Sequence, residues 1–214
     1  VQADRLAVLV TAWGRGEQCY VVLWQEIYGD PTLPEVWDDL DAILTATYHR
    51  QNGAELQVKA AFIDSGYKPQ EVYQFCRPRS RRKIFPSKGV GTANKPILST
   101  PTYQEVNVHG KRLKKGVRLW SVGTNAAKTL LYARLRIQGE GPGAIYTPQG
   151  LDESFYQQIT AEKLVTSYRK GFANREWVKV AARNEALDCW VYAYAAAIMA
   201  GMARADWGKL EAAL

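Results

Sequence analysis

Two aspartates stand in settings suited to metal binding. Asp64 ends the apolar run Ala60–Ile63 and is followed at once by a serine and a glycine, and Asp188 lies near the start of the apolar stretch 184–202. The carboxyl ends of strands in α/β sheets are where sites are built. Mg²⁺ and Mn²⁺ prefer oxygen ligands, and two such ions about 4 Å apart activate water and stabilise the leaving oxygen of a phosphodiester. The two aspartates predict such a site if the fold brings them together.

Each acid also has a simpler structural interpretation. Taken alone, Asp64 is more readily an Asx-type cap on the segment that follows its strand. Glu185 lies three positions before Asp188, so both acids project from one face of a helix, and acids in the first turn favour the helix dipole. Asp188 fits that interpretation less well, because its neighbours are leucine, cysteine, tryptophan and valine.

The sequence offers no comparable pattern for other chemistries. His49 and His109 have no metal-ligand partner at short spacing, and Cys19, Cys76 and Cys189 form no CxxC pair. This spacing argues against a zinc site or a disulfide framework and fits a reducing cytoplasm. Neither GxxxxGK[ST] nor GxSxG occurs, so the chain is not expected to hydrolyse nucleotide or to carry a serine nucleophile elbow.

Strands and helices must position these acids. Strands are predicted over 5–13, 18–28, 56–63, 83–86, 117–122 and 145–146, helices over 33–50, 70–76, 126–136, 152–159 and 184–202, and a hairpin over 164–181 around 170–174. An opening hairpin followed by alternating helices and strands indicates a mixed α/β sheet with helices on its faces. Residues 89–116 show no sustained period and many glycines, prolines and basic side chains, which predicts a long, flexible basic loop.

Charge is distributed unevenly along the chain. Residues 77–118 carry twelve basic side chains and one acid, whereas residues 1–76 carry five basic and eleven acidic ones. A basic block inside a globular chain is typical of a protein that binds a phosphate backbone, the alternative being a solvated loop. The predicted DNA-binding residues are Arg77, Arg79, Arg81, Arg82, Lys83, Lys88, Lys111, Arg112, Lys114 and Lys115.

Composition sets the broad class. At 47% hydrophobic and 23% charged residues over 214 positions, the chain is not intrinsically disordered as a whole. Its longest apolar run, 190–202, is too short to span a bilayer, and its first residues lack the basic region of a signal peptide. Membrane and secreted classes are therefore not expected.

A series of short motifs runs in order along nearly the whole chain. They are Val1–Leu6, Trp13–Glu17, Ile27–Pro31, Phe62–Gly66, Glu71–Tyr73, Phe75–Arg79, Lys88–Gly89, Val117–Thr124, Leu164–Thr166 and Arg183–Cys189. In this order they resemble the nuclease half of the lambda-type phage terminase large subunit. The resemblance implies an RNase H-like fold, related to Holliday-junction resolvases and retroviral integrases, with residues 1–214 as one nuclease domain and 89–116 as its flexible insertion.

The resemblance also implies a function and a set of site residues. Such domains cut concatemeric viral double-stranded DNA during genome packaging and use divalent metal, here Mg²⁺ or Mn²⁺ in a two-metal site. Asp64 matches the acid at the end of the fourth strand, Asp188 matches the acid of the last helix, and Glu185 is an accessory ligand. The basic group 77–83 and the basic group 111–115 at the tip of the insertion would both flank the cleft. The implied partners are DNA, the terminase small subunit and the capsid portal, with no membrane, in the host cytoplasm.

One feature departs from the family pattern. The family's first acid falls in a Val-Asp that would lie immediately before Val1, and the ATPase motor would lie further N-terminal; Asp4 is more simply a turn residue. Two other functions therefore stay open beside the nuclease. One is a catalytically incomplete DNA-binding or docking domain of the same motor, and the other is a resolvase-like or transposase-like nuclease.

Overall fold

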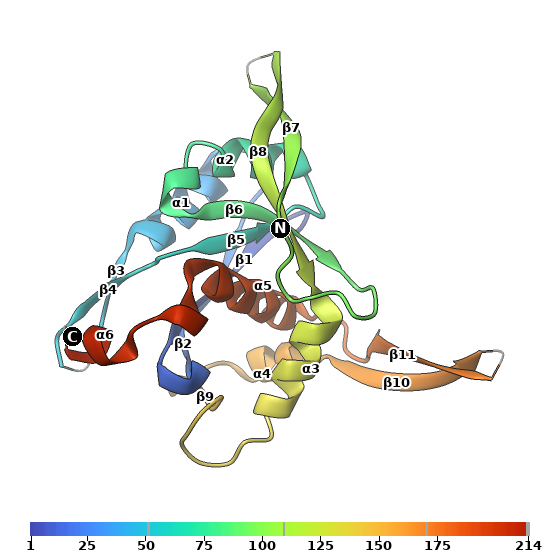
Figure 1. Ribbon diagram of the computed structural model, residues 1–214. Helices are drawn as coiled ribbons and strands as arrows, with labels where there is room; N and C mark the ends of the chain where they lie inside the picture. Colours follow the sequence, from blue (N-terminus) through green and yellow to red (C-terminus); the bar gives the residue numbers. More distant parts are fainter. Residues whose placement is uncertain (51, 109, 170, 213–214) are drawn as a thin grey trace.

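The computed structural model describes residues 1–50, 52–108, 110–169 and 171–212 of the chain (Figure 1). The strands are β1 (Arg5–Trp13), β2 (Cys19–Tyr28), β3 (Thr47–His49), β4 (Glu55–Gln57), β5 (Ala61–Asp64), β6 (Ile84–Val90), β7 (Thr102–Val108), β8 (Lys111–Gly123), β9 (Ile145–Tyr146), β10 (Glu162–Arg169) and β11 (Phe172–Lys179). The α-helices are α1 (Glu35–Thr45), α2 (Pro69–Cys76), α3 (Thr124–Arg134), α4 (Glu153–Ile159), α5 (Glu185–Ala200) and α6 (Trp207–Ala212).

The strands form two larger sheets and two separate hairpins. One sheet has the order β1-β2-β9, and the other has the order β5-β6-β8-β7. In the second sheet β5, β6 and β8 run parallel, and β7 pairs antiparallel with β8. The pairs β3–β4 and β10–β11 stand apart as hairpins. The predicted mixed α/β class is confirmed, as are the opening hairpin and the five predicted helices, although α1 is shorter than expected because residues 47–49 form β3.

Helices cover both faces of β1. Leu6 and Val8 belong to a core cluster with the buried faces of α1 and α2, whereas Leu9 packs against a second cluster built on α5. Since successive side chains of a strand point to opposite faces, the two clusters lie on opposite sides of the strand. The second cluster joins α5 to buried residues of α3, α4 and β2, including Trp190, Leu131 and Phe155.

The segment expected to be a flexible loop is instead largely a hairpin. Residues 102–108 and 111–123 pair as β7 and β8, with register shifts between Gln104 and Val106. The glycines, prolines and charges of this segment hide a strand pattern whose inward positions are Val106 and Val117, both buried. This prediction was wrong because the alternation is carried by only a few apolar residues among many charged ones.

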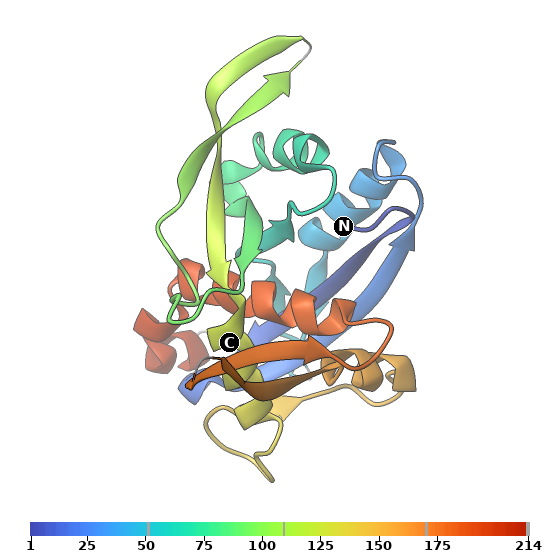
Figure 2. The same cartoon turned by 90° about the vertical axis from the view of Figure 1, so that its right-hand side faces the viewer.

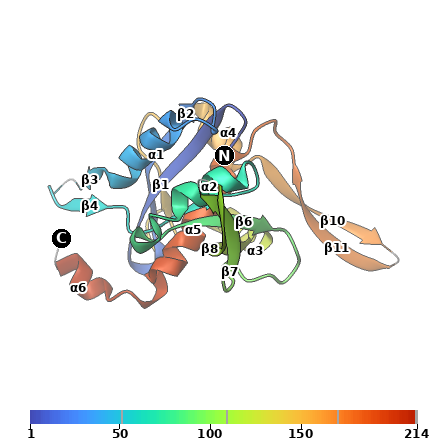
Figure 3. The ribbon, with the colours of Figure 1, turned by 90° about the horizontal axis from the view of Figure 1, so that it is seen from above.

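Two hairpins project from the body in different directions. The β7–β8 hairpin rises clear of the rest in the first two views, and it is seen nearly end-on from above (Figures 1, 2 and 3). The β10–β11 hairpin extends sideways in Figures 1 and 3. It is the hairpin predicted over 164–181, with residue 170 outside the described residues.

Candidate metal centre and basic surfaces

Asp64 lies at the last position of β5, where the strand leaves the sheet. Its partner in the parallel pair with β6 is Ser87, whose side chain is buried. Asp64 Oδ1 accepts hydrogen bonds from the Gly66 backbone N–H at 3.2 Å and from the Tyr192 hydroxyl at 3.0 Å. The first bond is the Asx-type cap that the sequence suggests, and the second turns the carboxylate toward α5. Asp64 therefore serves as a cap and still faces the helix that carries Asp188.

Asp188 lies in the first turn of α5 in a crowded, partly negative environment. Its Oδ2 accepts a hydrogen bond from Asn184 Nδ2 at 3.1 Å, and Lys128 Nζ lies 3.7 Å from its Oδ1. Burial raises the pKa of Asp188 to about 6; Lys128 opposes the rise, while the negative charges of Glu162 and Asp64 add to it. Because 44% of the side chain is open to solvent, a cation can reach this carboxylate.

The structure brings the two predicted aspartates into the same neighbourhood. The charge of Asp64 acts on the pKa of Asp188, and both charges act on the pKa of Tyr192. Cys189, next to Asp188, donates its thiol to the Ala7 carbonyl of β1 at 3.4 Å. The strand β1, the end of β5 and the start of α5 therefore meet at one place.

The donors at this place suit a hard divalent cation. Among the described residues, no hydrogen bond reaches Asp64 Oδ2, so this oxygen is available as a ligand beside Asp188. Carboxylate oxygens are the ligands that Mg²⁺ and Mn²⁺ prefer. Within the described ranges, no group of three or more histidine, cysteine, aspartate or glutamate side chains is arranged to hold a metal ion.

Glu185, the predicted accessory ligand, is engaged elsewhere. It is buried and pairs with Arg5 at 3.0 Å and with Arg183 at 3.2 Å, and both arginines also pair with Glu26. Burial alone would raise the pKa of Glu185, but its own backbone N–H, Arg183 and Arg5 together lower it. A metal role for Glu185 would have to compete with this ionic network.

The buried ion pair beside Asp188, between Lys128 and Glu162, has no signal in the sequence. Glu162 begins β10 and is buried; both of its carboxylate oxygens accept hydrogen bonds from Lys128 Nζ at 2.8 Å. Asn184 Nδ2 bridges Glu162 and Asp188. Lys128 and Glu162 are 34 positions apart on different elements, so no spacing rule pairs them. Tyr192 had a detectable signal, because it lies four residues after Asp188 on the same helix face.

A polar cavity of about 460 Å³ adjoins the Lys128–Glu162 pair. It lies between the start of α3, the Gly91–Ala93 segment and β11. Its lining includes Lys128, Glu162, Arg175, Glu176 and Lys179. Strand β11 therefore forms one wall of a cavity that Lys128 and Glu162, the neighbours of Asp188, also line.

The predicted DNA-binding residues fall into three places. Lys88 is exposed and lies one residue beyond Ser87, so it is near Asp64. Lys111, Arg112, Lys114 and Lys115 occupy the exposed outer part of β8. Trp120 of β8 pairs with Ser87, and Lys111 lies nine residues earlier, which corresponds to up to about 30 Å along the strand. Arg112 pairs with Glu105 at 2.6 Å.

The third group, Arg77–Lys83, lies at the far end of β6. The Lys83 carbonyl accepts from the Ala61 N–H at the beginning of β5, whereas Asp64 ends that strand. The expectation that this group flanks the same cleft as the insertion is therefore wrong, because α2 carries the chain back to the opposite end of the parallel strands. Two of its members share one carboxylate: Arg79 and Arg82 each lie 2.9 Å from Asp41 of α1.

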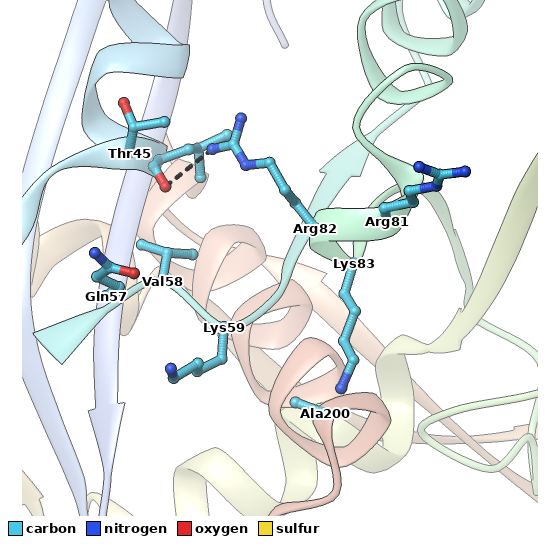
Figure 4. Close-up of a pocket in the computed structure, with 9 residues that line it drawn as sticks. Thr45, Gln57, Val58, Lys59, Arg81, Arg82, Lys83 and Ala200 are labelled. Carbon is cyan, nitrogen blue, oxygen red and sulfur yellow. Dashed lines mark hydrogen bonds between the residues drawn. The ribbon is translucent and has the colours of Figure 1, made fainter.

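Part of this group opens onto a basic pocket of about 510 Å³ (Figure 4). Lys59, Arg81, Arg82 and Lys83 contribute to its lining, together with Ala200 at the end of α5. In Figure 4, Lys83 extends toward Ala200, and Arg82 donates to the Leu44 carbonyl at 3.2 Å. Ala200 lies twelve residues after Asp188, or about 18 Å along the helix. This group of cations thus lies at the opposite end of α5 from Asp188.

A mixed α/β fold with two carboxylates meeting at a strand end and a helix start, beside a basic hairpin, is typical of metal-dependent phosphodiester hydrolases. Comparison with known families agrees. The family "Terminase large subunit gpA, endonuclease domain" matches residues 1–207, and the chain belongs to this family. The resemblance that the sequence motifs indicate is confirmed.

Two curated relatives are similar over most of this chain. The chain is 34% identical over 203 residues to the terminase large subunit of Escherichia phage lambda, and 32% identical over 204 residues to that of Enterobacteria phage P21. In each case 91% of this chain is covered, and it spans about 30% of the relative's length. No solved structure matches. Among the described residues, no helix has the length and apolar character needed to cross a membrane.

Proposed function

We propose that this chain is the metal-dependent endonuclease domain of a viral DNA-packaging terminase and cuts concatemeric double-stranded DNA by phosphodiester hydrolysis. The observation that carries the proposal is the meeting of Asp64 and Asp188 from β5 and α5 at one solvent-accessible place. The family of the chain, an endonuclease domain, supports it. DNA, the terminase small subunit and the capsid portal are its proposed partners, in the cytoplasm of the host bacterium.

Asp64 and Asp188 are the residues that would hold Mg²⁺ or Mn²⁺, with Glu185 as an accessory ligand if its arginines release it. When bound, such ions activate water and stabilise the leaving oxygen. Asp64 presents Oδ2 because Gly66 and Tyr192 occupy its Oδ1. Asn184 orients Asp188, and Lys128 partly offsets its unfavourable charge, which keeps the carboxylate ready for a cation.

We also propose that the fold is RNase H-like, with residues 1–214 forming one nuclease domain. The edge strand β1 of one sheet and the edge strand β5 of the other both pack against α5. Val1 packs against the cluster that contains residues of both strands. A strand carrying the acid that the resemblance places before Val1 would fit between these two edges and join the sheets. It would also bring a third carboxylate to Asp64 and Asp188.

The basic residues would bind the duplex by its phosphates. Within the described residues, Lys88, Lys111, Lys114 and Lys115 form no ion pair, so their charges are available. The tip of the β7–β8 hairpin lies up to about 30 Å from the acids along the strand, a distance equal to about nine base pairs of DNA at 3.4 Å each. Phosphate contacts fix register without reading bases, so this domain would show little sequence preference of its own.

Plasmid nicking tests the proposal, on a chain that includes the acid placed before Val1. We expect nicking with Mn²⁺ or Mg²⁺, weaker or no nicking with Zn²⁺, and none with EDTA, because the proposed ligands are all oxygen. Undiminished activity in EDTA would remove metal ions from the mechanism. DNA binding without any cleavage would favour the alternative, a catalytically incomplete docking domain of the same motor. Selective cleavage of branched junctions over linear duplex would favour a resolvase-like nuclease.

A further inference from the structure

Tyr192 links the two elements that carry the aspartates. It lies one helical turn after Asp188 on α5, and its hydroxyl donates a hydrogen bond to Asp64 Oδ1 at 3.0 Å. No other hydrogen bond that the structure shows between side chains of the described residues joins α5 to Asp64. Packing sets the spacing of α5 and β5, and the Tyr192 hydroxyl is the group of α5 that fixes the orientation of the Asp64 carboxylate.

Gly89 provides the space for this contact. It lies two residues after Ser87 on β6, so it faces the same side of the sheet as the residue paired with Asp64. A Cβ at Gly89 would lie 3.0 Å from the Tyr192 hydroxyl and 2.9 Å from Thr124 Cγ2. The first distance is tight for the hydroxyl and the second is shorter than real Cβ contacts allow. An alanine there would push against the ring that reaches Asp64.

The Tyr192 hydroxyl is the donor in this contact. It reaches Asp64 Oδ1 from a part-buried position at 3.0 Å. Together with the Gly66 N–H it satisfies Oδ1 of Asp64, and Oδ2 accepts no hydrogen bond from the described residues. The carboxylate is thus fixed with one oxygen occupied and the other presented.

We propose that Tyr192 is a positioning residue that holds Asp64 so that its Oδ2 and Asp188 bind the same divalent cation. This inference rests on the proposed function, because it concerns the same metal site. The competing explanation is that the hydrogen bond merely fastens α5 to β5. The two explanations differ in their consequences: fastening contributes to the free energy of unfolding without metal, whereas positioning contributes to metal affinity.

Tyr192→Phe removes only the phenol oxygen, and Tyr194→Phe is the matched control. Tyr194 lies on the same helix and its hydroxyl donates to Glu17 at 2.7 Å, on the side facing Arg134 and away from Asp64. We expect Mn²⁺ binding, measured by calorimetry on the folded protein, to weaken by about tenfold or more in Tyr192→Phe and to stay at the wild-type value in Tyr194→Phe. Gly89→Ala should weaken Mn²⁺ binding in the same direction by displacing the Tyr192 ring.

Melting without metal completes the test. Equal Mn²⁺ affinity in wild type and Tyr192→Phe, with a lower melting temperature for the variant, would overturn the proposal in favour of fastening. A similar loss of affinity in Tyr192→Phe and Tyr194→Phe would also overturn it, because the effect would then be general to the helix. If the wild-type chain that includes the acid placed before Val1 binds no Mn²⁺ and cleaves no DNA, the proposed function itself fails. If the wild type cleaves DNA and Tyr192→Phe binds Mn²⁺ as tightly as the wild type, the role of Tyr192 is rejected and the proposed function stands.

Discussion

The two ends of α5 hold different electrostatic environments. Near its start, Asp188 shares its surroundings with the negative Asp64 and Glu162, and its pKa rises to about 6. Near its end, the basic pocket gathers Lys59, Arg81 and Lys83, and the nearby carboxylate, Asp41, lies against two arginines that lower its pKa. The negative charge of an aspartate is thus only partly balanced at the start of α5, where Asp188 lies, and is fully paired near its end, where Asp41 lies.

This difference separates carboxylates with a structural role from those available for chemistry. The charge of Asp41 is paired with two arginines of the protein, so this carboxylate stabilises the fold and is not available to a ligand. Asp188 keeps an unfavourable charge in the folded chain, and such a cost is typical of groups arranged for a ligand. A divalent cation would balance the negative charge at the start of α5, and phosphate oxygens would balance the positive charge of the basic pocket at its end.

The largest effect is expected at the acidic end. Asp188→Asn keeps the shape and removes the anionic ligand, so cleavage should fall by about 100-fold or more. Without metal the same variant should melt at a higher temperature than wild type at pH 7. An acid with a raised folded pKa costs stability above that pKa and none below its unfolded value, so the gain appears between about pH 4 and 6 and persists above it.

The stability gain should be modest, at most about 1 kcal/mol, because the Asp188 side chain is 44% exposed and solvent screens its charge. Nicking assays and metal-free thermal melts from about pH 3 to 8, a range that spans both the unfolded and the folded pKa, measure the two effects. Retained cleavage would remove Asp188 from the site, and a lost melting transition would make it structural.

A smaller effect is expected from the cations of the β7–β8 hairpin. Changing Lys111, Arg112, Lys114 and Lys115 together to glutamine should weaken duplex binding. It should also lower the slope of log affinity against log salt by about 0.9 for each phosphate that the protein no longer neutralises. Binding titrations over a range of salt concentrations measure this slope, with the lysine-to-arginine changes at 111, 114 and 115 as the charge-preserving control.

An unchanged slope would assign the hairpin to contact with another subunit or the capsid portal. Lys59→Gln, Arg81→Gln and Lys83→Gln, made together, then test the other end of the molecule. If these three residues contact the DNA, the slope of log affinity against log salt should fall in the triple variant by a similar amount per charge. If the duplex contacts only the end of the molecule that carries Asp188, the triple variant should keep the wild-type slope.

The sequence predicts many of the elements around α5, but it does not predict the contrast between the two ends of this helix. Local patterns predict the β1–β2 hairpin, α5 and the setting of Asp64, because each depends on neighbours within a few residues. They miss the β7–β8 hairpin because charged side chains mask its sparse apolar alternation. The Lys128–Glu162 pair and the return of Arg77–Lys83 to the far end of β6 depend on how distant elements pack, which no local spacing encodes.

The smallest effect concerns Asp41, the saturated carboxylate. Its hydrogen bonds from Arg79 lower its pKa most, burial opposes this, and Arg82 lowers it further. A lowered folded pKa means that the stabilisation is fully present above the unfolded value near 4 and is lost as the pH falls through the folded pKa. Asp41→Asn should therefore cost about 1 kcal/mol at pH 7 and progressively less below pH 4, as followed by urea unfolding. The Asp41→Asn variant should cleave DNA at the wild-type rate. A loss of cleavage equal to that of Asp188→Asn would mean that the two ends of α5 are not separate, and the contrast between them would have to be abandoned.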